Sequence, residues 1–119
     1  MLFRSKYENG ECIADVEVVR AQLAEIYTKV ESQRALTFDA ARAYDSKSGD
    51  FELKALASRL NATENVIEIC GKAMKLGGGI AYSKFLPLER YLRDSYASLV
   101  MSPTPDILQK WLGDKVVKI

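Results

Sequence analysis

Two short segments contain the residue types that can bind anions through the backbone. Gly77-Gly78-Gly79 could bring backbone N–H groups close to a phosphate, because glycine lets a ligand approach the chain closely. Thr104-Pro105-Asp106 can open a helix, whose first N–H groups and positive dipole end can hold a pyrophosphate. Neither segment is specific alone, since a flexible connector explains the glycines and helix capping explains the threonine. Both interpretations stay open at this level.

Several kinds of side-chain chemistry are excluded by residue type. The chain has no histidine, which removes the commonest general base and any Ser-His or Cys-His nucleophile pair. Cys12 and Cys70 are far apart in the sequence and lack CxxC spacing, so a zinc site is not predicted. We therefore expect two free thiols rather than a disulfide.

Composition bounds the class of protein. Lys and Arg number 17 against 16 Asp and Glu, and a net charge of +1 gives no long-range attraction for nucleic acid or an anionic membrane. Hydrophobic residues make up 48% and charged residues 28%, as in ordinary globular domains. The sequence has neither a transmembrane run of about 18 apolar residues nor the long apolar segment of a secretory signal. We expect a cytoplasmic protein that binds neither nucleic acid nor membrane.

The anion-binding candidates must be positioned by helices, because apolar residues recur at alternating spacings of three and four. The first predicted helix is capped by Asp15 and ends at the polar turn 45–49. The second is capped by Asp50 and ends at the glycines 77–79, because three successive glycines cost too much backbone entropy to continue a helix.

Prolines mark the starts of two further helices. Pro87 is the predicted first residue of a third helix, and Thr104 is the predicted N-cap of a fourth that has Pro105 at its first position. No segment alternates with period two, so a sheet is not supported. The sequence predicts an all-α protein, an antiparallel four-helix up-and-down bundle over 15–119, preceded by an irregular segment at 1–14.

The order of these segments resembles the C-terminal helical domain of the acyl-CoA dehydrogenase family. Gly78-Gly79-Ile80-Ala81-Tyr82 is followed, after four residues, by Pro87-Leu88-Glu89-Arg90-Tyr91-Leu92-Arg93-Asp94. These runs match the family's glycine pair, aromatic residue and P-x-E-x-x-x-R-D motif, and Thr104-x-Asp106 matches its threonine-x-acid or amide pair. Upstream segments that look like the family's preceding helices are Leu23-Ala24-Glu25-Ile26, Ala41 to Asp45 and Ala62-Thr63-Glu64.

The resemblance implies a helical bundle that drives dimer and tetramer formation, with FAD bound at the subunit boundary. It implies that Lys75, Leu76, Gly77, Gly78 and Gly79 contact the pyrophosphate or adenine side of FAD from a neighbouring subunit. It also implies that Thr104 and Asp106 touch the cofactor. FAD would supply the redox chemistry, because no side chain here can transfer a hydride. An acyl-CoA substrate is implied only for the complete enzyme.

Two positions depart from the family pattern. Ser102 stands where many members carry the glutamate that removes the acyl α-proton, and a serine without a partner base cannot do this at neutral pH. Lys75 replaces the family's glutamine at the start of the glycine segment. The chain also lacks the family's N-terminal helical domain, its β-domain and the first bundle helix.

Two functions remain open on the sequence. In the first, the chain is the C-terminal domain of an FAD-dependent acyl-CoA dehydrogenase-like oxidoreductase and is inactive alone. In the second, it is a non-enzymatic helical oligomerisation or interaction module that has lost cofactor binding. In both cases a shortened bundle exposes an apolar stripe, so we expect a homodimer, a higher oligomer or a complex with the missing domains.

Overall fold

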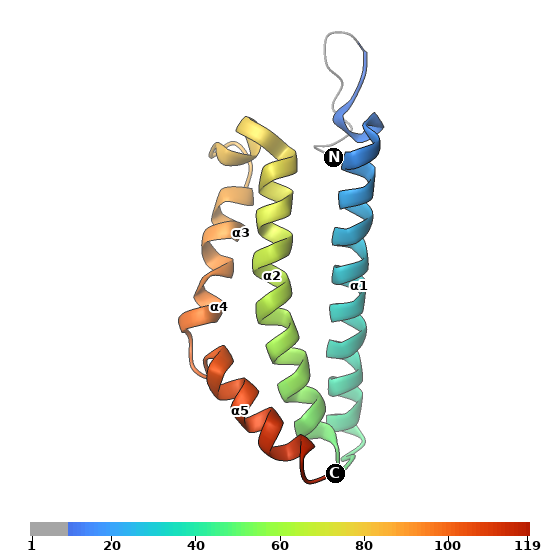
Figure 1. The fold of residues 1–119 in the computed structure, drawn as a ribbon, viewed down its shortest axis with the longest axis vertical. Coiled ribbons are helices and arrows are strands. Elements are labelled where there is room, and N and C mark those ends of the chain that lie inside the picture. The colour runs from blue at the N-terminus through green and yellow to red at the C-terminus, as the bar shows by residue number, and fades with distance from the viewer. Residues whose placement is uncertain (1–9) are drawn as a thin grey trace.

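A computed structural model describes residues 10–119, which form an antiparallel set of helices (Figure 1). α1 runs along the molecule, α2 returns beside it, and α3, α4 and α5 follow one another along the other side of α2. These residues contain no strand, which confirms the all-α class. The elements are the 3₁₀ turn η2 (Ile13–Asp15), α1 (Glu17–Asp45), α2 (Phe51–Tyr82), α3 (Leu88–Ser95), α4 (Ala97–Val100) and α5 (Pro105–Val116).

The N-terminal part of the chain differs from the prediction in one respect. Residues 1–9 of the predicted irregular segment lie outside the described residues. Asp15 does not cap α1, whose N-cap is Val16. The Asp15 carboxylate instead accepts hydrogen bonds from the backbone N–H of Cys12 (3.2 Å) and from its Sγ (3.0 Å), and pairs with Arg20 (3.1 Å). The cap prediction was wrong because η2 uses this side chain.

Polar side chains join α1 to α2 at the middle of their seam. The Gln33 amide nitrogen donates to the carbonyl of Ser58 (3.1 Å) and to the hydroxyl of Thr37 (2.9 Å). Its amide oxygen accepts a hydrogen bond from Asn61 (2.7 Å). The two helices are therefore fixed in register by directional bonds, because a shift of one turn would leave these groups unpaired.

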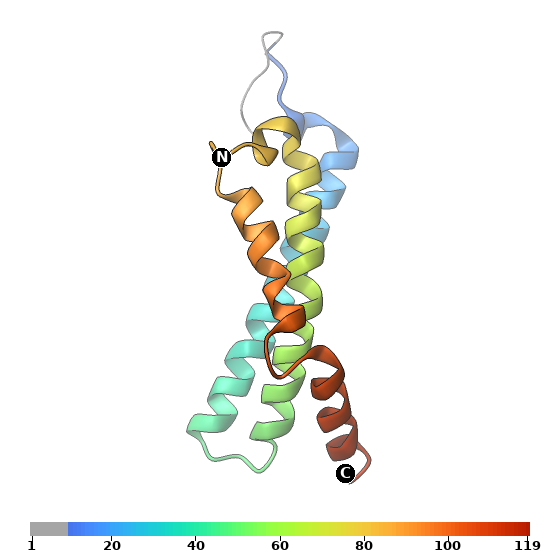
Figure 2. The ribbon, with the colours of Figure 1, turned by 90° about the vertical axis from the view of Figure 1, so that its left-hand side faces the viewer.

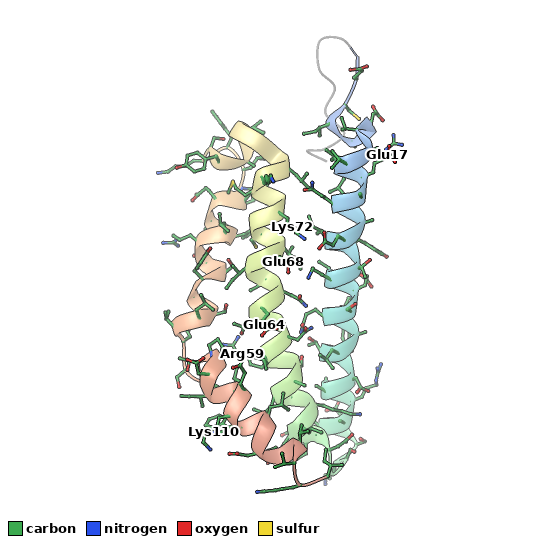
Figure 3. The ribbon with its side chains drawn as sticks, in the orientation of Figure 1. Glu17, Arg59, Glu64, Glu68, Lys72 and Lys110 are labelled. Atoms are coloured by element: carbon green, nitrogen blue, oxygen red, sulfur yellow. The ribbon has the colours of Figure 1, made fainter. Side chains whose placement is uncertain are left out.

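Ion pairs extend this seam towards the C-terminal end of α2 (Figure 3). Lys72 pairs with Glu25 of α1 and with Glu68 one turn earlier on α2 (2.8 Å). Glu68 also accepts a hydrogen bond from Lys29 of α1 (2.8 Å). The two lysines lower the pKa of Glu68 to about 2, because both stabilise its charged form.

The start of α2 follows the predicted position but not the predicted capping bond. Asp50 is the N-cap residue, and its side chain makes no capping hydrogen bond. Its carboxylate accepts a hydrogen bond from Ser48 and pairs with Lys54 (3.2 Å). Lys54 in turn pairs with Asp39 of α1 (2.9 Å), so this end of the seam is also closed by charges.

The regular part of α2 stops at the glycines, as predicted. Gly78 is non-helical, with φ +60° and ψ −150°, and α2 consists of two helices that meet at this kink and run on to Tyr82. Only glycine adopts this backbone region readily, so Gly78 is where the chain changes direction. Leu76 and Ala81, both buried, hold the two sides of the kink.

The third predicted helix is divided in two. Pro87 is the N-cap of α3 rather than its first helical residue, and the segment breaks at Tyr96 between α3 and the single turn of α4. α5 begins as predicted, with Thr104 as N-cap and Pro105 first. α5 lies beside the first half of α2 (Figure 2). Its main anchor is Leu108, which is 1% exposed. No helix among residues 10–119 is long and apolar enough to cross a bilayer.

Candidate functional site

The glycine segment lies at the kink near the end of α2. Leu76 is 6% exposed, so its side chain faces the protein and any ligand contact there would use the backbone. Lys75, one residue earlier, is exposed. A Cβ added at Gly78 or Gly79 would meet nothing within 4 Å, so the backbone is open to an approaching group. The segment thus presents an open backbone surface beside one cation, which leaves room for a phosphate.

A cavity of about 440 Å³ lies between this end of α2 and α3. Its walls combine aromatic rings, two cations and one carboxylate. Arg93 pairs with the neighbouring Asp94 (2.7 Å). The lining residues are Met74, Tyr82, Lys84, Glu89, Leu92, Arg93 and Tyr96.

The second candidate segment is the start of α5. Thr104 has extended backbone angles, and its hydroxyl makes no capping hydrogen bond. The first intrahelical bond runs from the Leu108 N–H to the Thr104 carbonyl (2.9 Å). Because Pro105 has no N–H, the free donors of the first turn belong to Asp106 and Ile107. The Asp106 carboxylate is suited to accept from a ribose hydroxyl, whereas a phosphate would be repelled.

The structure does not bring these two segments together. The helical stretch from Leu88 to Val100 lies between them along α2 and rises about 20 Å (Figure 1). The pyrophosphate of one nucleotide is much shorter than this separation. One chain therefore cannot place both segments on the same pyrophosphate.

Ser102 stands at the position where the resembling family carries its catalytic base, and this position has no proton acceptor here. Ser102 is exposed in the loop between α4 and α5. A hydroxyl needs a neighbouring base to act at neutral pH, and no carboxylate contact to Ser102 occurs within residues 10–119. The described part of the chain also holds no cluster of three metal-binding side chains.

A more apolar cavity of about 520 Å³ lies between α2 and the α3–α4 segment, and Met101 next to Ser102 forms part of its wall. Arg59, labelled in Figure 3, and Asp94 also line it. Both cysteines are free thiols. Burial raises the pKa of the Cys70 thiol in this cavity, against the opposing effect of its hydrogen bond with Ser95. Cys70 is thus protonated at neutral pH and is a poor nucleophile.

The sequence identified the glycine and threonine segments but missed the lining of the cavity beside the kink. Tyr82 and Arg93 belong to the motif that carried the resemblance, yet neither was assigned to a site. Lys84 and Tyr96 belong to no motif. Their approach depends on the kink at Gly78, which interrupts the helical period, so spacing could not have found them.

Comparison with known proteins points to the same family as the motifs of the sequence. Residues 2–110 match the family described as "Acyl-CoA dehydrogenase, C-terminal domain". The chain is 32% identical over 92% of its length to the short-chain specific acyl-CoA dehydrogenase of Bos taurus mitochondria, of which it covers 26%. It is 30% identical to the NADH-dependent acryloyl-CoA reductase of Anaerotignum propionicum, over 92% of the chain and 27% of the relative.

A third relative is a subunit of the caffeyl-CoA reductase–Etf complex of Acetobacterium woodii. It is 28% identical over 97% of this chain, which covers 30% of that protein. The chain thus spans less than a third of the length of these three curated relatives.

Proposed function

The chain belongs to the acyl-CoA dehydrogenase family, as its C-terminal domain, and from this premise we propose that it serves an FAD-dependent oxidoreductase acting on acyl-CoA thioesters. Its part would be to contribute cofactor contacts and an oligomer interface. The chain would be inactive without the segments that cover the remaining length of its relatives. Its cytoplasmic location stays a prediction.

The observation that carries this proposal is the open backbone at Gly78 and Gly79. The open space at these glycines beside exposed Lys75 leaves room for a phosphate, and the unused Thr104 hydroxyl with the carboxylate of Asp106 fits a nucleotide's phosphate and hydroxyl groups. The donor set therefore suits the nucleotide part of FAD. When bound, FAD would supply hydride acceptance, which no side chain of this chain can provide.

The separation of the two segments supports a shared site. Because α3 and α4 lie between them, we propose that the two segments of one chain touch different cofactors, or different parts of one cofactor. Two copies would then complete each site, one giving the 75–79 segment and the other giving Thr104 and Asp106. This arrangement agrees with the subunit-boundary position implied by the resemblance.

The direction of the reaction follows from the relatives only in part. One is named a dehydrogenase and two are named reductases of CoA thioesters. We propose α,β-dehydrogenation of an acyl-CoA or the related reduction, with the catalytic base supplied by a residue other than Ser102. The relative from Acetobacterium woodii is a subunit of a complex with Etf, and an electron-carrier partner of that kind is part of the proposal.

The alternative is a non-enzymatic helical module derived from the same family. Ser102 at the base position favours it, because this chain then lacks the group that removes the α-proton. Loss of cofactor binding with retention of self-association would be its signature.

A titration of the 119-residue chain with FAD, followed by flavin fluorescence, tests the proposal. We expect saturable binding that weakens when Thr104 and Asp106 are both changed to alanine, because the hydroxyl and carboxylate contacts are lost. Lys110→Ala, one to two turns further along α5, is the matched control and should bind like the wild type. Absence of binding up to millimolar FAD would reject cofactor binding by this chain and favour the helical module.

A further inference from the structure

The outer face of α1 has a regular stripe that, outside α1, bonds within the described chain only at its first residue, where Arg20 donates to the Ala14 carbonyl (2.7 Å) and to Asp15 (3.1 Å). Positions 20, 24, 27, 31, 34, 38, 41 and 45 follow one another at spacings that alternate strictly between four and three. This is the heptad spacing of a helix-pairing seam. Tyr27 is 67% exposed and Phe38 is 55% exposed, and both belong to this stripe.

α1 packs on α2 through a different face. The residues that contact α2 include Glu25, Lys29 and Gln33, and none of these belongs to the stripe. Among the described elements, the substantial neighbours of α1 are α2 and η2 only. α1 therefore lies at one edge of the molecule (Figure 1), and its stripe is separate from the face that contacts α2.

The stripe is complementary to itself when read in opposite directions. From the ends inward it pairs Arg20 with Asp45 and then Ala24 with Ala41. Both charged side chains at the ends are exposed, and both alanines are small enough to let two backbones approach closely.

The centre of the stripe continues the same symmetry. Tyr27 pairs with Phe38, and Glu31 pairs with Arg34. Within one chain, Glu31 and Arg34 form only a loose ion pair of 3.9 Å, and the Arg34 guanidinium lies 6.0 Å from the centre of the Phe38 ring. These groups are thus available for better partners than their own helix offers.

We propose that this stripe binds the stripe of a second copy of the chain, with the two α1 helices antiparallel. A two-fold axis between residues 31 and 34 would bring each Glu31 to the Arg34 of the other copy and each Tyr27 to the other Phe38. The contact would be isologous, as in most homodimers. It deepens the proposed oligomer interface by naming its surface, and it does not depend on flavin binding.

The opposite orientation is disfavoured by charge. Two parallel α1 helices would place Glu31 on Glu31 and Arg34 on Arg34, so like charges would meet along the seam. A lipid surface is also a poor occupant, because acidic and basic side chains alternate along the stripe. Self-complementarity therefore selects a second copy in antiparallel orientation.

Charge reversal tests the pairing. Glu31→Arg and Arg34→Glu each place two like-charge contacts in the dimer, so each should weaken dimerisation about tenfold or more. The double variant E31R/R34E restores opposite charges and should recover wild-type association. Sedimentation equilibrium gives the dissociation constants, and circular dichroism checks that each variant is folded. Lys110→Glu, on exposed α5, is the control and should dimerise normally.

Cross-linking tests the orientation. In a background with Cys12→Ser and Cys70→Ala, oxidation of mixed Ala24→Cys and Ala41→Cys chains should give a disulfide-linked heterodimer. Neither variant alone should cross-link, because positions 24 of two antiparallel chains lie about 25 Å apart. A wild-type monomer at micromolar concentration, unaffected association in both single variants, or cross-linking of Ala24→Cys alone would overturn the proposal. Each of these results leaves the FAD titration unchanged, so the two proposals fail separately.

Discussion

The two edges of α2 are held by different kinds of contact. On the α1 edge, hydrogen bonds and ion pairs cross the seam from Lys54 near one end to Lys72 near the other. On the opposite edge, α5 is held mainly by Leu108 and by an ion pair between Lys115 and Glu52. Thr104 and Asp106 lie at the start of α5 on this second edge, and the glycine segment lies at the end of α2.

The same difference appears in the space between the helices. The cavities of about 440 Å³ and 520 Å³ lie where α2 meets α3 and α4. A third, of about 290 Å³, separates α2 from α5 beside the half-exposed Trp111. Contacts on this edge are interrupted, so its helices should open at a lower free energy than α1.

The largest expected effect comes from removing the anchor of α5. Leu108→Ala deletes a fully buried side chain and should cost about 3 kcal/mol. Trp111, the only tryptophan, reports on α5, so its fluorescence midpoint in urea should fall further than the helical signal of circular dichroism. Ile107→Ala, at a partly exposed neighbour, is the control and should cost less. If the fluorescence and circular dichroism midpoints fell by the same amount, the two edges of α2 would unfold as one cooperative unit. The proposed difference between the edges would then be wrong.

The next effect concerns the kink. Gly78→Ala forces a side chain into a positive φ and should destabilise the protein by about 1–2 kcal/mol, although the added methyl group meets no neighbour. Gly79→Ala has ordinary backbone angles and space, so it should be neutral or stabilising. Urea unfolding measures both. Equal loss in the two variants would show that the backbone angle at Gly78 does not hold the kink.

Removing the centre of the α1–α2 network should have a comparable or smaller effect. Gln33→Ala removes the hydrogen bonds to Asn61 and to the Ser58 carbonyl, whereas the Ser58 hydroxyl keeps its bond with Thr37, and the change should cost about 1 kcal/mol. Circular dichroism in urea measures the change. Gln109→Ala, on the exposed face of α5, should change stability little. A neutral Gln33→Ala would mean that water replaces the network and that apolar packing alone joins the two helices.

The smallest expected effect is a dependence on pH. The folded-state pKa of Glu68 is lowered from 4.5 to about 2, so its contribution is present above pH 4.5 and is lost as the pH falls towards 2. Wild type should melt above Glu68→Gln at neutral pH, and the difference in Tm should vanish near pH 2. Glu64→Gln, one turn away and in no ion pair within residues 10–119, is the matched control. A constant difference in Tm across this range would contradict the role of Lys29 and Lys72.

The sequence predicted the elements whose signals are local. Apolar spacing found the two long helices, and Thr104 with Pro105 fixed the start of α5 because N-cap and first-turn preferences depend on adjacent residues only. The glycines marked the end of the regular part of α2, because each glycine costs about 1 kcal/mol in a helix. The short helical piece between the kink and Tyr82 was not predicted, because the burial of Ala81 depends on the folded protein.

The two motifs of the candidate site could be predicted from the sequence, but their positions relative to each other in the fold could not. The order of the glycine and threonine segments does not give their separation, which depends on how α3 and α4 lie along α2. Asp15 shows the same limit on a small scale. A carboxylate next to a helix start can cap it or join a preceding turn, and the bonds from Cys12 decided between these uses.

The central position of α2 has a mechanical consequence. α1 and α5 have no substantial contact with each other among the described elements, and both pack on α2. Any displacement imposed on α1 must therefore reach the start of α5 as a shift or rotation of α2, whose regular part up to Gly77 is about 40 Å long. Directional hydrogen bonds fix the register of α2 with α1, so a sliding movement of α1 along its axis would carry α2 with it. The kink at Gly78 is the point where that motion can be absorbed.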